Sequence, residues 1–351
     1  MKQIRYLKQE EKQSTREMYE TIFPEDSGEF VDYYYKWKTR DNDILVMEDN
    51  AGYEVMMHLN PYSVRVNGTL KKIRYIVAVA TRPDCRRQGK MQQVMKRALQ
   101  DLQKIHCPFM FLLPADPAYY YGQGFVFAPK SCKNSGNEQS IIKHIETTKF
   151  RKAMNVNCVV LDGINQQKMQ QAVETANAIL AEQYDVYIQR DRNYYERLLE
   201  EVASEHGKVF LIEDKGITDK GQVIGILAYG REERAEIKEF LLFSQYEEVR
   251  KEICDRIFGA AGWQEEEMRM MFRITDLQSL SGMVKGEPEL LIVEVTDSMV
   301  EANNGIWQME WNPQGGSVTR LKETVAKKQM DISEVTEKVV KKMSIFIREW
   351  V

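Results

Sequence analysis

A short apolar strand followed by a basic glycine turn and an amphipathic helix constrains this chain more than any other segment. Residues 76–80 read Ile-Val-Ala-Val-Ala, and Pro83 ends the apolar run. Residues 88–103 then place apolar side chains at helical spacing, at Met91, Val94, Met95, Ala98, Leu99 and Leu102. The pattern predicts a strand, a turn through Gly89 and a helix that begins at this turn.

The turn has the features of an anion site suited to a diphosphate. Amides in the first turn of a helix lack intrahelical partners and lie at the positive end of the helix dipole, so those from Arg87 to Met91 can point at one anion. Gly89 has no Cβ, which lets phosphate oxygens approach the backbone. Arg86 and Arg87 add forked donors and Lys90 adds a point charge. The alternative is that these cations only solvate a surface turn.

The turn differs from the common nucleotide motifs and resembles a cofactor loop. A Walker loop needs Ser or Thr after Gly-Lys, whereas Met91 follows Lys90 here, and no Gly-x-Gly-x-x-Gly follows a strand. Val-Ala-Val-Ala-Thr-Arg-Pro followed by Arg-Arg-Gln-Gly-Lys-Met resembles the acetyl-CoA loop of the GNAT acetyltransferases, with Arg86 at its first position and Gly89 at its glycine. Met91 stands where that superfamily usually has Gly or Ala. A large apolar residue there resembles the enhanced intracellular survival (Eis) branch.

A second segment, about thirty residues further on, agrees with this resemblance. Residues 109–114 form an apolar strand, and Tyr-Tyr-Tyr-Gly-Gln-Gly-Phe at 119–125 resembles the Tyr-x-x-x-Gly-Phe ending of the family. In the family this tyrosine faces the cofactor sulfur, and Tyr120 holds the matching position. A phenol with a pKa of about 10 stays protonated at neutral pH and can protonate a leaving thiolate. Tyr121 is the next candidate, and the three tyrosines can also be read as packing residues.

The resemblance implies acetyl-CoA as cosubstrate and assigns residues to it. An extended pantetheine arm can pair with the backbone of a strand edge, which places Val77 and Val79 beside it through their N–H and C=O groups. The cofactor residues expected are Val77, Val79, Arg86, Arg87, Gln88, Gly89, Lys90 and Met91.

The periodicity predicts a mixed α/β chain with more than one domain. A length of 351 residues, with 43% hydrophobic and 29% charged residues, exceeds one comfortable core. Helices are predicted at 14–23, 30–37, 88–103, 166–183, 193–204, 245–258 and from 331. Strands are predicted at 43–48, 53–59, 70–80, 108–113, 124–128, 156–161, 208–213, 222–229, 235–242, 289–296, 305–311 and 317–322.

The order of these elements suggests three domains and an overall α/β (α+β) fold of tandem GNAT units. Residues 1–150 form the acetyl-CoA-binding unit, and 151–268 resemble a degenerate second GNAT fold, since no Arg-x-x-Gly turn lies between Leu227 and Tyr246. Residues 269–351 resemble the sterol-carrier-protein-like domain of Eis proteins but are shorter. Within it, Asp331 and Glu334 predict a capping box at the start of the last helix.

The resemblance also gives the chain end a role. In the family the last residues enter the acetyltransferase active site, and here the chain ends Phe-Ile-Arg-Glu-Trp-Val at 346–351. A buried α-carboxylate at Val351 has a raised pKa and can act as the base for an incoming ammonium. A frayed terminus is the alternative, although the segment is too apolar for a disordered tail.

Acidic and aromatic residues supply candidates for the acceptor site. The acidic loop between the first two helices resembles the acceptor loop of the family, and nearby rings can wall a cavity or hold a cation over a ring face. The alternatives are solvated carboxylates and core aromatics. The candidates are Glu25, Asp26, Glu29, Phe30, Tyr34, Trp37 and Glu349.

Charge and composition argue against several other classes of protein. The net charge is −4 with both signs interspersed, so nucleic acid is not an expected partner. No membrane span or secretory signal core is expected, which predicts a cytoplasmic protein. The 5 cysteines and 4 histidines have no metal-ligand spacing, so no metal is expected.

The resulting prediction is an Eis-like N-acetyltransferase that moves acetyl from acetyl-CoA to a primary amine by direct attack. The acceptor class is an aminoglycoside, a polyamine or another small amine, or a protein lysine. The resemblance implies a homo-oligomer, a trimer or hexamer. Two alternatives stay open: a non-catalytic acetyl-CoA sensor or regulator, and a lipid carrier that acts through the C-terminal domain.

Overall fold

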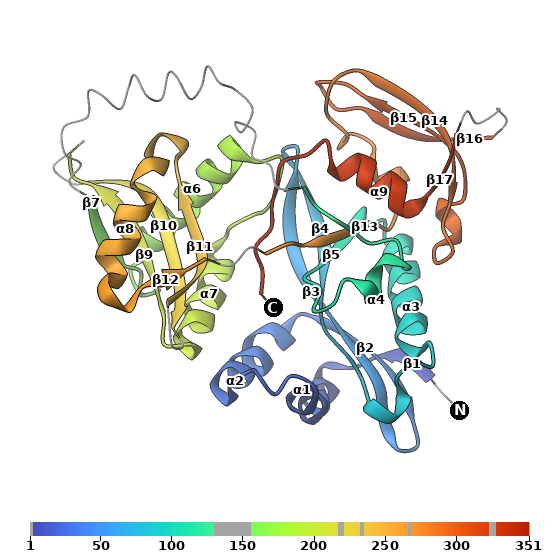
Figure 1. Cartoon of the computed structure of the whole chain (residues 1–351), viewed down its shortest axis with the longest axis horizontal. Coiled ribbons are helices and arrows are strands. Elements are labelled where there is room, and N and C mark those ends of the chain that lie inside the picture. The colour runs from blue at the N-terminus through green and yellow to red at the C-terminus, as the bar shows by residue number, and fades with distance from the viewer. Residues whose placement is uncertain are drawn as a thin grey trace. The chain divides into compact units, whose positions relative to one another are not determined.

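The computed structural model describes residues 3–129, 156–216, 221–231, 235–265, 268–322 and 328–350. These residues fall into two compact units (Figure 1). The first unit combines residues 3–129 with 269–347. The second unit combines the described residues between 156 and 268 with 348–350.

The first unit is built on a mixed sheet with one parallel pair at its centre. Seven of its strands follow the order β1-β2-β3-β4-β5-β13-β6; within this order β4 and β5 pair in parallel and the other neighbours pair antiparallel. The bounds are β1 Gln3–Tyr6, β2 Asp43–Asp49, β3 Gly52–Val66, β4 Thr69–Thr81, β5 Phe109–Leu112, β13 Met271–Ile274 and β6 Val126–Phe127. A strand from late in the chain therefore lies between two strands of the N-terminal segment.

Helices cover both faces of this sheet. Alternation along β2 and β3 sends Ile44, Val46 and Met56 to one face, where they share a core with α1 (Arg16–Ile22) and α2 (Gly28–Trp37). The amphipathic helix α3 (Lys90–Lys104) packs against β2, β3 and β4. Shorter elements complete this part: η1 Gln9–Thr15, η2 Lys38–Arg40, η3 Pro83–Cys85 and α4 Ala118–Tyr121.

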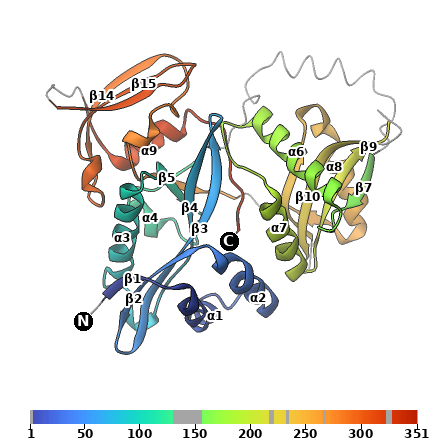
Figure 2. The same cartoon turned by 180° about the vertical axis from the view of Figure 1, so that it is seen from behind.

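The C-terminal part of the first unit is a smaller sheet with one helix. Strands β14 (Glu289–Thr296), β15 (Gly305–Trp311), β16 (Ser317–Leu321) and β17 (Lys328–Asp331) have the order β16-β15-β14-β17. Helix α9 (Ile332–Val340) packs on β13 and β17, and Asp331 and Glu334 form the predicted capping box. Figure 2 shows α9 between the smaller sheet and β5. The remaining elements are η6 Gln278–Leu280, η7 Glu301–Asn303 and β18 Ile345–Phe346.

The second unit is another α/β layer, with strand order β12-β11-β10-β9-β7. Helices α6 and α7 pack on β10, while α8 shares a separate core with Ile224, Leu227 and Phe240. The bounds are β7 Val156–Val160, α6 Gln166–Gln183, β8 Val186–Ile188, α7 Arg192–Ser204, β9 Lys208–Asp214, β10 Gln222–Arg231, β11 Ala235–Leu242, η4 Ser244–Val249, α8 Arg250–Phe258, η5 Gly259–Ala261 and β12 Trp263–Gln264.

The mixed α/β fold class is confirmed, and most predicted elements agree with the structure within a few residues. The predicted helix from Ser14 is wrong at its start, because Gln9–Thr15 forms a 3-10 helix and the α-helix begins at Arg16. The short strands β1 and β13 were not predicted. The boundary near residue 150 lies outside the described residues, and the three-domain division stays a prediction.

Candidate active site

The basic glycine turn forms an open backbone cradle at the start of α3. Gly89 has φ of +69° and is the N-cap residue of α3, and no side chain caps the first-turn amides. Arg87 also has a positive φ, of 60°. Alternating backbone conformations of this kind turn successive N–H groups toward one point, as in anion-binding nests. A Cβ at Gly89 would meet nothing within 4 Å, so its surroundings are open.

The side chains of the cradle divide into exposed and buried groups. Arg86, Arg87 and Gln88 are exposed. Arg86 donates from Nε to the carbonyl of Thr81 at 3.1 Å, and Gln88 donates to the carbonyl of Asp84 at 3.0 Å. These bonds hold the two side chains beside the turn while their outer faces meet solvent.

Lys90 behaves differently from the other cations of the cradle. Its side chain is only 6% exposed, and its Nζ lies 2.5 Å from Oε1 of Glu54, which is 2% exposed. Glu54 lies on β3, so the pair joins the start of α3 to the sheet. The Lys90 charge is thus compensated within the protein, which leaves Arg86, Arg87 and the amides as the solvent-facing anion donors.

A β-bulge in β4 precedes the cradle. His58 pairs with Val77 and Met56 pairs with Ala80, so Ala78 and Val79 together oppose a single residue of β3. Ala78, the first residue of the bulge, has a positive φ of 49°. The register between β4 and β5 ends at Ile76 and Leu112. Within the described strands, the edge of β4 at Val77 and Val79 therefore continues past its last β5 partner, and sequence reasoning did not foresee the bulge.

The tyrosine turn buries one of its three rings. Tyr120 is 8% exposed, whereas Tyr119 and Tyr121 are 63% and 53% exposed. The Tyr120 ring packs edge-on against Phe125, with ring centroids 5.8 Å apart. Burial, with a smaller contribution from Tyr119, raises the pKa of Tyr120 to about 12. The phenol therefore holds its proton throughout the neutral range.

Gln123 joins the tyrosine turn to the cradle. Its Nε2 donates to the carbonyl of Tyr119 at 2.6 Å and lies 3.5 Å from Sδ of Met91. The backbone N–H of Gln123 donates to the carbonyl of Tyr120 at 3.0 Å. Sequence reasoning missed Gln123, whose only signal was its place between the two glycines of the turn.

The acidic candidates lie around the start of α2: Glu25 and Asp26 precede the helix, and Glu29 is in its first turn. Glu25 and Glu29 are exposed, and Asp26 is half-buried. Asp26 accepts a hydrogen bond of 2.7 Å from the hydroxyl of Tyr19. Ser27 caps α2 by accepting from the amide of Phe30 at 3.1 Å, which fixes where this loop enters the helix.

The aromatic candidates of α2 lie mostly in the core. Phe30 is 6% exposed and Tyr34 is fully buried. The Tyr34 hydroxyl lies 2.9 Å from Nδ1 of His58. Trp37 is half-buried, with the guanidinium of Arg40 3.9 Å from its ring centroid. For Phe30 and Tyr34, burial favours the core role that the sequence left open, and Arg40 already uses one face of Trp37.

The last described residues belong to the second unit. Arg348 donates to Glu265 at 2.6 Å and to the carbonyl of Ile237 at 2.8 Å. Glu349 is 6% exposed and accepts from the Tyr194 hydroxyl at 3.2 Å. The ring of Trp350 lies 4.3 Å from Nζ of Lys238. Residues 348–350 are therefore packed rather than frayed, and Val351 lies outside the described residues.

The described residues contain neither a metal-binding cluster nor a helix that could span a membrane. Among the described residues, no group of three His, Cys, Asp or Glu side chains is placed to hold a metal ion. Cys132 and His144 lie outside the described ranges. None of the helices described is both long and apolar enough to cross a membrane.

Comparisons with known proteins agree with this geometry. Residues 3–128 match the family model described as an acetyltransferase (GNAT) domain. No curated protein matches the sequence.

Several solved structures have a similar fold. A conserved protein of unknown function from Enterococcus faecalis V583, described as a probable N-acyltransferase, superimposes with a TM-score of 0.73 at 16% identity over 96% of this chain and 89% of that chain. A GCN5-related N-acetyltransferase from Anabaena variabilis gives 0.68 at 18% identity, over 96% and 90%. Eis1 from Mycobacterium abscessus gives 0.64 at 11% identity, over 97% and 89%.

At these identities the similarity establishes the fold alone. The sequence match, the parallel β4–β5 pair and the cradle at the start of α3 fall in the same segment of the chain. Residues 3–128 thus have both the sequence pattern and the fold of a GNAT acetyltransferase domain.

Proposed function

We propose that this protein is an acetyl-CoA-dependent N-acetyltransferase that acts on a primary amine. The observation that carries the proposal is the link between the two motif segments: Gln123 contacts Met91 at the cradle and the Tyr119 carbonyl in the tyrosine turn. An anion cradle and a buried, protonated phenol held together in this way suit a cosubstrate that has both a diphosphate and a thioester.

The residues of the cradle fit this cosubstrate. The uncapped amides of α3, with Arg86 and Arg87, would bind the diphosphate, while Gln88, Gly89 and Met91 shape the turn. Lys90 would act through its pair with Glu54, by fixing the helix start. The free edge of β4 at Val77 and Val79 would pair with the amide groups of the pantetheine arm.

Two protons have to move during direct acetyl transfer. Acetyl-CoA supplies the acetyl thioester. The amine attacks the acetyl carbon and loses a proton to the base as the C–N bond forms, a backbone N–H near Val79 stabilises the oxyanion, and the C–S bond breaks to release a thiolate that the acid protonates. Tyr120 is the proposed acid, since it is buried and protonated at neutral pH. The Val351 carboxylate is the proposed base, a role taken from the resemblance to Eis proteins.

The acceptor class is a small amine or a protein lysine. Asp26, with Glu25 and Glu29 beside it, would attract an ammonium at the start of α2. Trp37 would border this region, and the buried Phe30 and Tyr34 would support it from the core. Glu349 would act through the chain end. A homo-oligomer remains part of the proposal, and light scattering of the full chain tests it.

The C-terminal sheet is not proposed as a lipid site. Its inner face is filled by Trp307, Met309 and Trp311, which are 2%, 0% and 1% exposed. Lipid that co-purifies in native mass spectra would reopen that alternative.

The test is thiol release from acetyl-CoA against aminoglycosides, diamines and lysine peptides. The native chain is compared with a chain that has residues appended after Val351 and with one that has the same residues at its N-terminus. We expect turnover with the native and N-terminally extended chains and loss of turnover with the C-terminal extension. Acetyl-CoA binding without any turnover would instead favour the sensor, and equal turnover by all three chains would remove Val351 from the mechanism.

A further inference from the structure

We infer that Arg273, held by Asp297, is a positioning residue for Tyr120, so that the C-terminal segment forms part of the acetyltransferase site. The inference rests on the proposed function for its kinetic part. Arg273 lies on β13, the strand that the C-terminal segment inserts between β5 and β6. It lies 150 residues from Gln123 along the chain.

Arg273 makes three directional contacts and is 0% exposed. Its Nε donates to the carbonyl of Gln123 at 2.6 Å, one terminal nitrogen donates to the carbonyl of Ile274 at 2.8 Å, and the other donates to Asp297 at 2.7 Å. Desolvation of a guanidinium is costly, and an apolar side chain would fill the same space without that cost. A buried arginine is therefore best explained by a backbone carbonyl that needs a fixed donor, which the rigid fork provides.

The contact reaches Tyr120 through one short turn. Gln123, whose carbonyl Arg273 holds, bonds back to the Tyr120 carbonyl through its own N–H. Gly124 follows with φ of +84°, and a Cβ there would lie 2.8 Å from Ile332 and 3.1 Å from Nε of Arg273. The turn is thus pressed against β13 and α9. A shift of Arg273 would therefore move the backbone of this turn, and with it the position of the Tyr120 ring.

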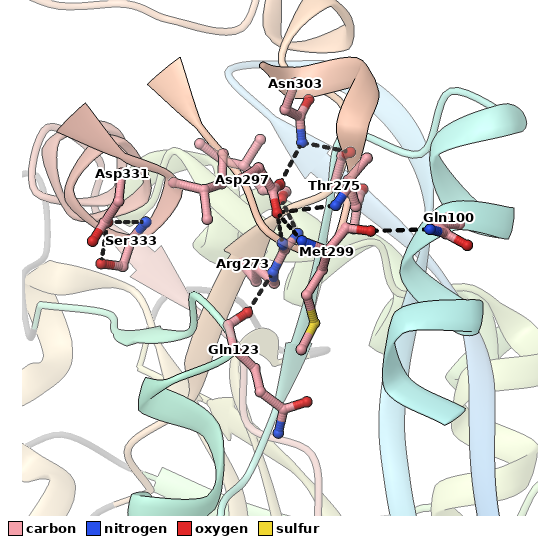
Figure 3. Close-up of polar contacts among 12 residues, drawn as sticks. Gln100, Gln123, Arg273, Thr275, Asp297, Met299, Asn303, Asp331 and Ser333 are labelled. Atoms are coloured by element: carbon pink, nitrogen blue, oxygen red, sulfur yellow. Dashed lines mark hydrogen bonds and ion pairs between the residues drawn. The ribbon is translucent and has the colours of Figure 1, made fainter. Parts of the chain in front are cut away.

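Asp297 is itself held on all sides. One carboxylate oxygen accepts from Arg273 and from the amides of Met299 and Val300 at 2.9 and 3.0 Å. The other accepts from Asn303 at 2.9 Å. The same turn reaches α3, because Gln100 donates to the Met299 carbonyl at 3.2 Å. One turn of the C-terminal segment therefore contacts both the helix of the cradle and, through Arg273, the tyrosine turn (Figure 3).

The test uses the full chain with Arg273→Lys, which keeps a charge for Asp297 but has no fork, and Arg273→Met as a second variant. We expect Arg273→Lys to lower kcat by about ten- to a hundredfold with little change in the KM for acetyl-CoA, because a small misplacement of a catalytic group is costly. In a Tyr120→Phe background the same substitution should cost less than about threefold, because the acid it positions is already gone.

The matched control is Met309→Ala, which leaves a cavity at a buried residue of β15, in the smaller sheet that does not contain β13. Its effect on kcat should be the same in the wild type and in the Tyr120→Phe background. Hydrogen exchange gives a readout independent of activity: peptides covering residues 117–127 should exchange faster in both Arg273 variants and be unchanged in Met309→Ala.

The outcomes separate the two proposals. Additive effects of Arg273→Lys and Tyr120→Phe, or unchanged exchange at 117–127, would overturn the positioning role. A wild-type protein that neither binds nor turns over acetyl-CoA would overturn the proposed function, while faster exchange in the Arg273 variants would still support positioning of the turn.

Discussion

Nζ of Lys90 lies 2.5 Å from Oε1 of Glu54, with both side chains buried. This ion pair fixes the first residue of α3 to β3, directly behind the cradle. The sequence suggested Lys90 as a phosphate ligand, whereas in the structure its side chain supports the cradle from inside the protein. Its removal should therefore affect the fold of the cradle more than the charge seen by a ligand.

Glu54→Gln should destabilise the protein by about 3–5 kcal/mol, because it removes the negative charge that lies 2.5 Å from the buried Lys90 ammonium. Urea unfolding at neutral pH measures the change. Glu337→Gln is the control, since it removes an exposed helical pair with Lys341 and should change the stability little. Equal stabilities for the wild type and Glu54→Gln would show that the pair is not formed in solution.

Gly89→Ala and Gly89→Glu should both weaken acetyl-CoA binding. The first strains a backbone with φ of +69°, and the second adds a negative charge at the proposed diphosphate site. We expect at least a tenfold rise in Kd for Gly89→Glu, about 1.4 kcal/mol, by calorimetric titration.

Gly68→Ala provides the matched control for the glycine. It has φ of +84° and equally open surroundings, but it lies in the turn between β3 and β4. Its substitution should cost stability and leave Kd unchanged. A Kd that is unaffected by Gly89→Glu would rule out the cradle as the diphosphate site.

Tyr120→Phe should lower kcat by about a hundredfold with acetyl-CoA affinity intact, since it removes only the hydroxyl of the proposed proton donor. Tyr119→Phe and Tyr121→Phe are the controls, because both rings are exposed. With a pKa of about 12, Tyr120 stays protonated as the pH rises from 7 to 10. No alkaline loss of kcat due to this group is expected in that range, and full activity of Tyr120→Phe would exclude it as the acid.

His58 should make the protein less stable in mild acid. Burial, with a smaller contribution from Lys12, lowers its pKa to about 3, whereas an unfolded histidine has a pKa of about 6.5. Between these values the unfolded state binds the extra proton, so stability falls as the pH drops below 6.5. The loss attributable to His58 at pH 5 is about 2 kcal/mol.

Urea unfolding at pH 7 and pH 5 tests this linkage. His58→Gln should lower the stability at pH 7 but reduce its dependence on pH by the same 2 kcal/mol or so. His106→Gln is the comparison at an exposed histidine: its side chain is 77% exposed and its Nδ1 lies 2.9 Å from Oδ2 of Asp276, so its substitution should not reduce the pH dependence in this way. An unchanged pH dependence in His58→Gln would mean that His58 is not buried as a neutral ring.

Local patterns in the sequence determined the elements that carry the candidate site. The apolar run of β4, the glycine at the start of α3 and the spacing along that helix depend only on near neighbours, so the strand, turn and helix could be predicted. The capping box at Asp331 and Glu334 has the same local origin. These signals act within a few residues and are readable without the fold.

Tertiary structure decided how those elements become a site. It selected Tyr120 for burial among three identical residues, paired Lys90 with Glu54, and set the bulge at Ala78. It also inserted β13 between β5 and β6, which brings Arg273 to a turn 150 residues away. Such pairings depend on packing and desolvation between distant segments, and a sequence pattern reports only on neighbours along the chain.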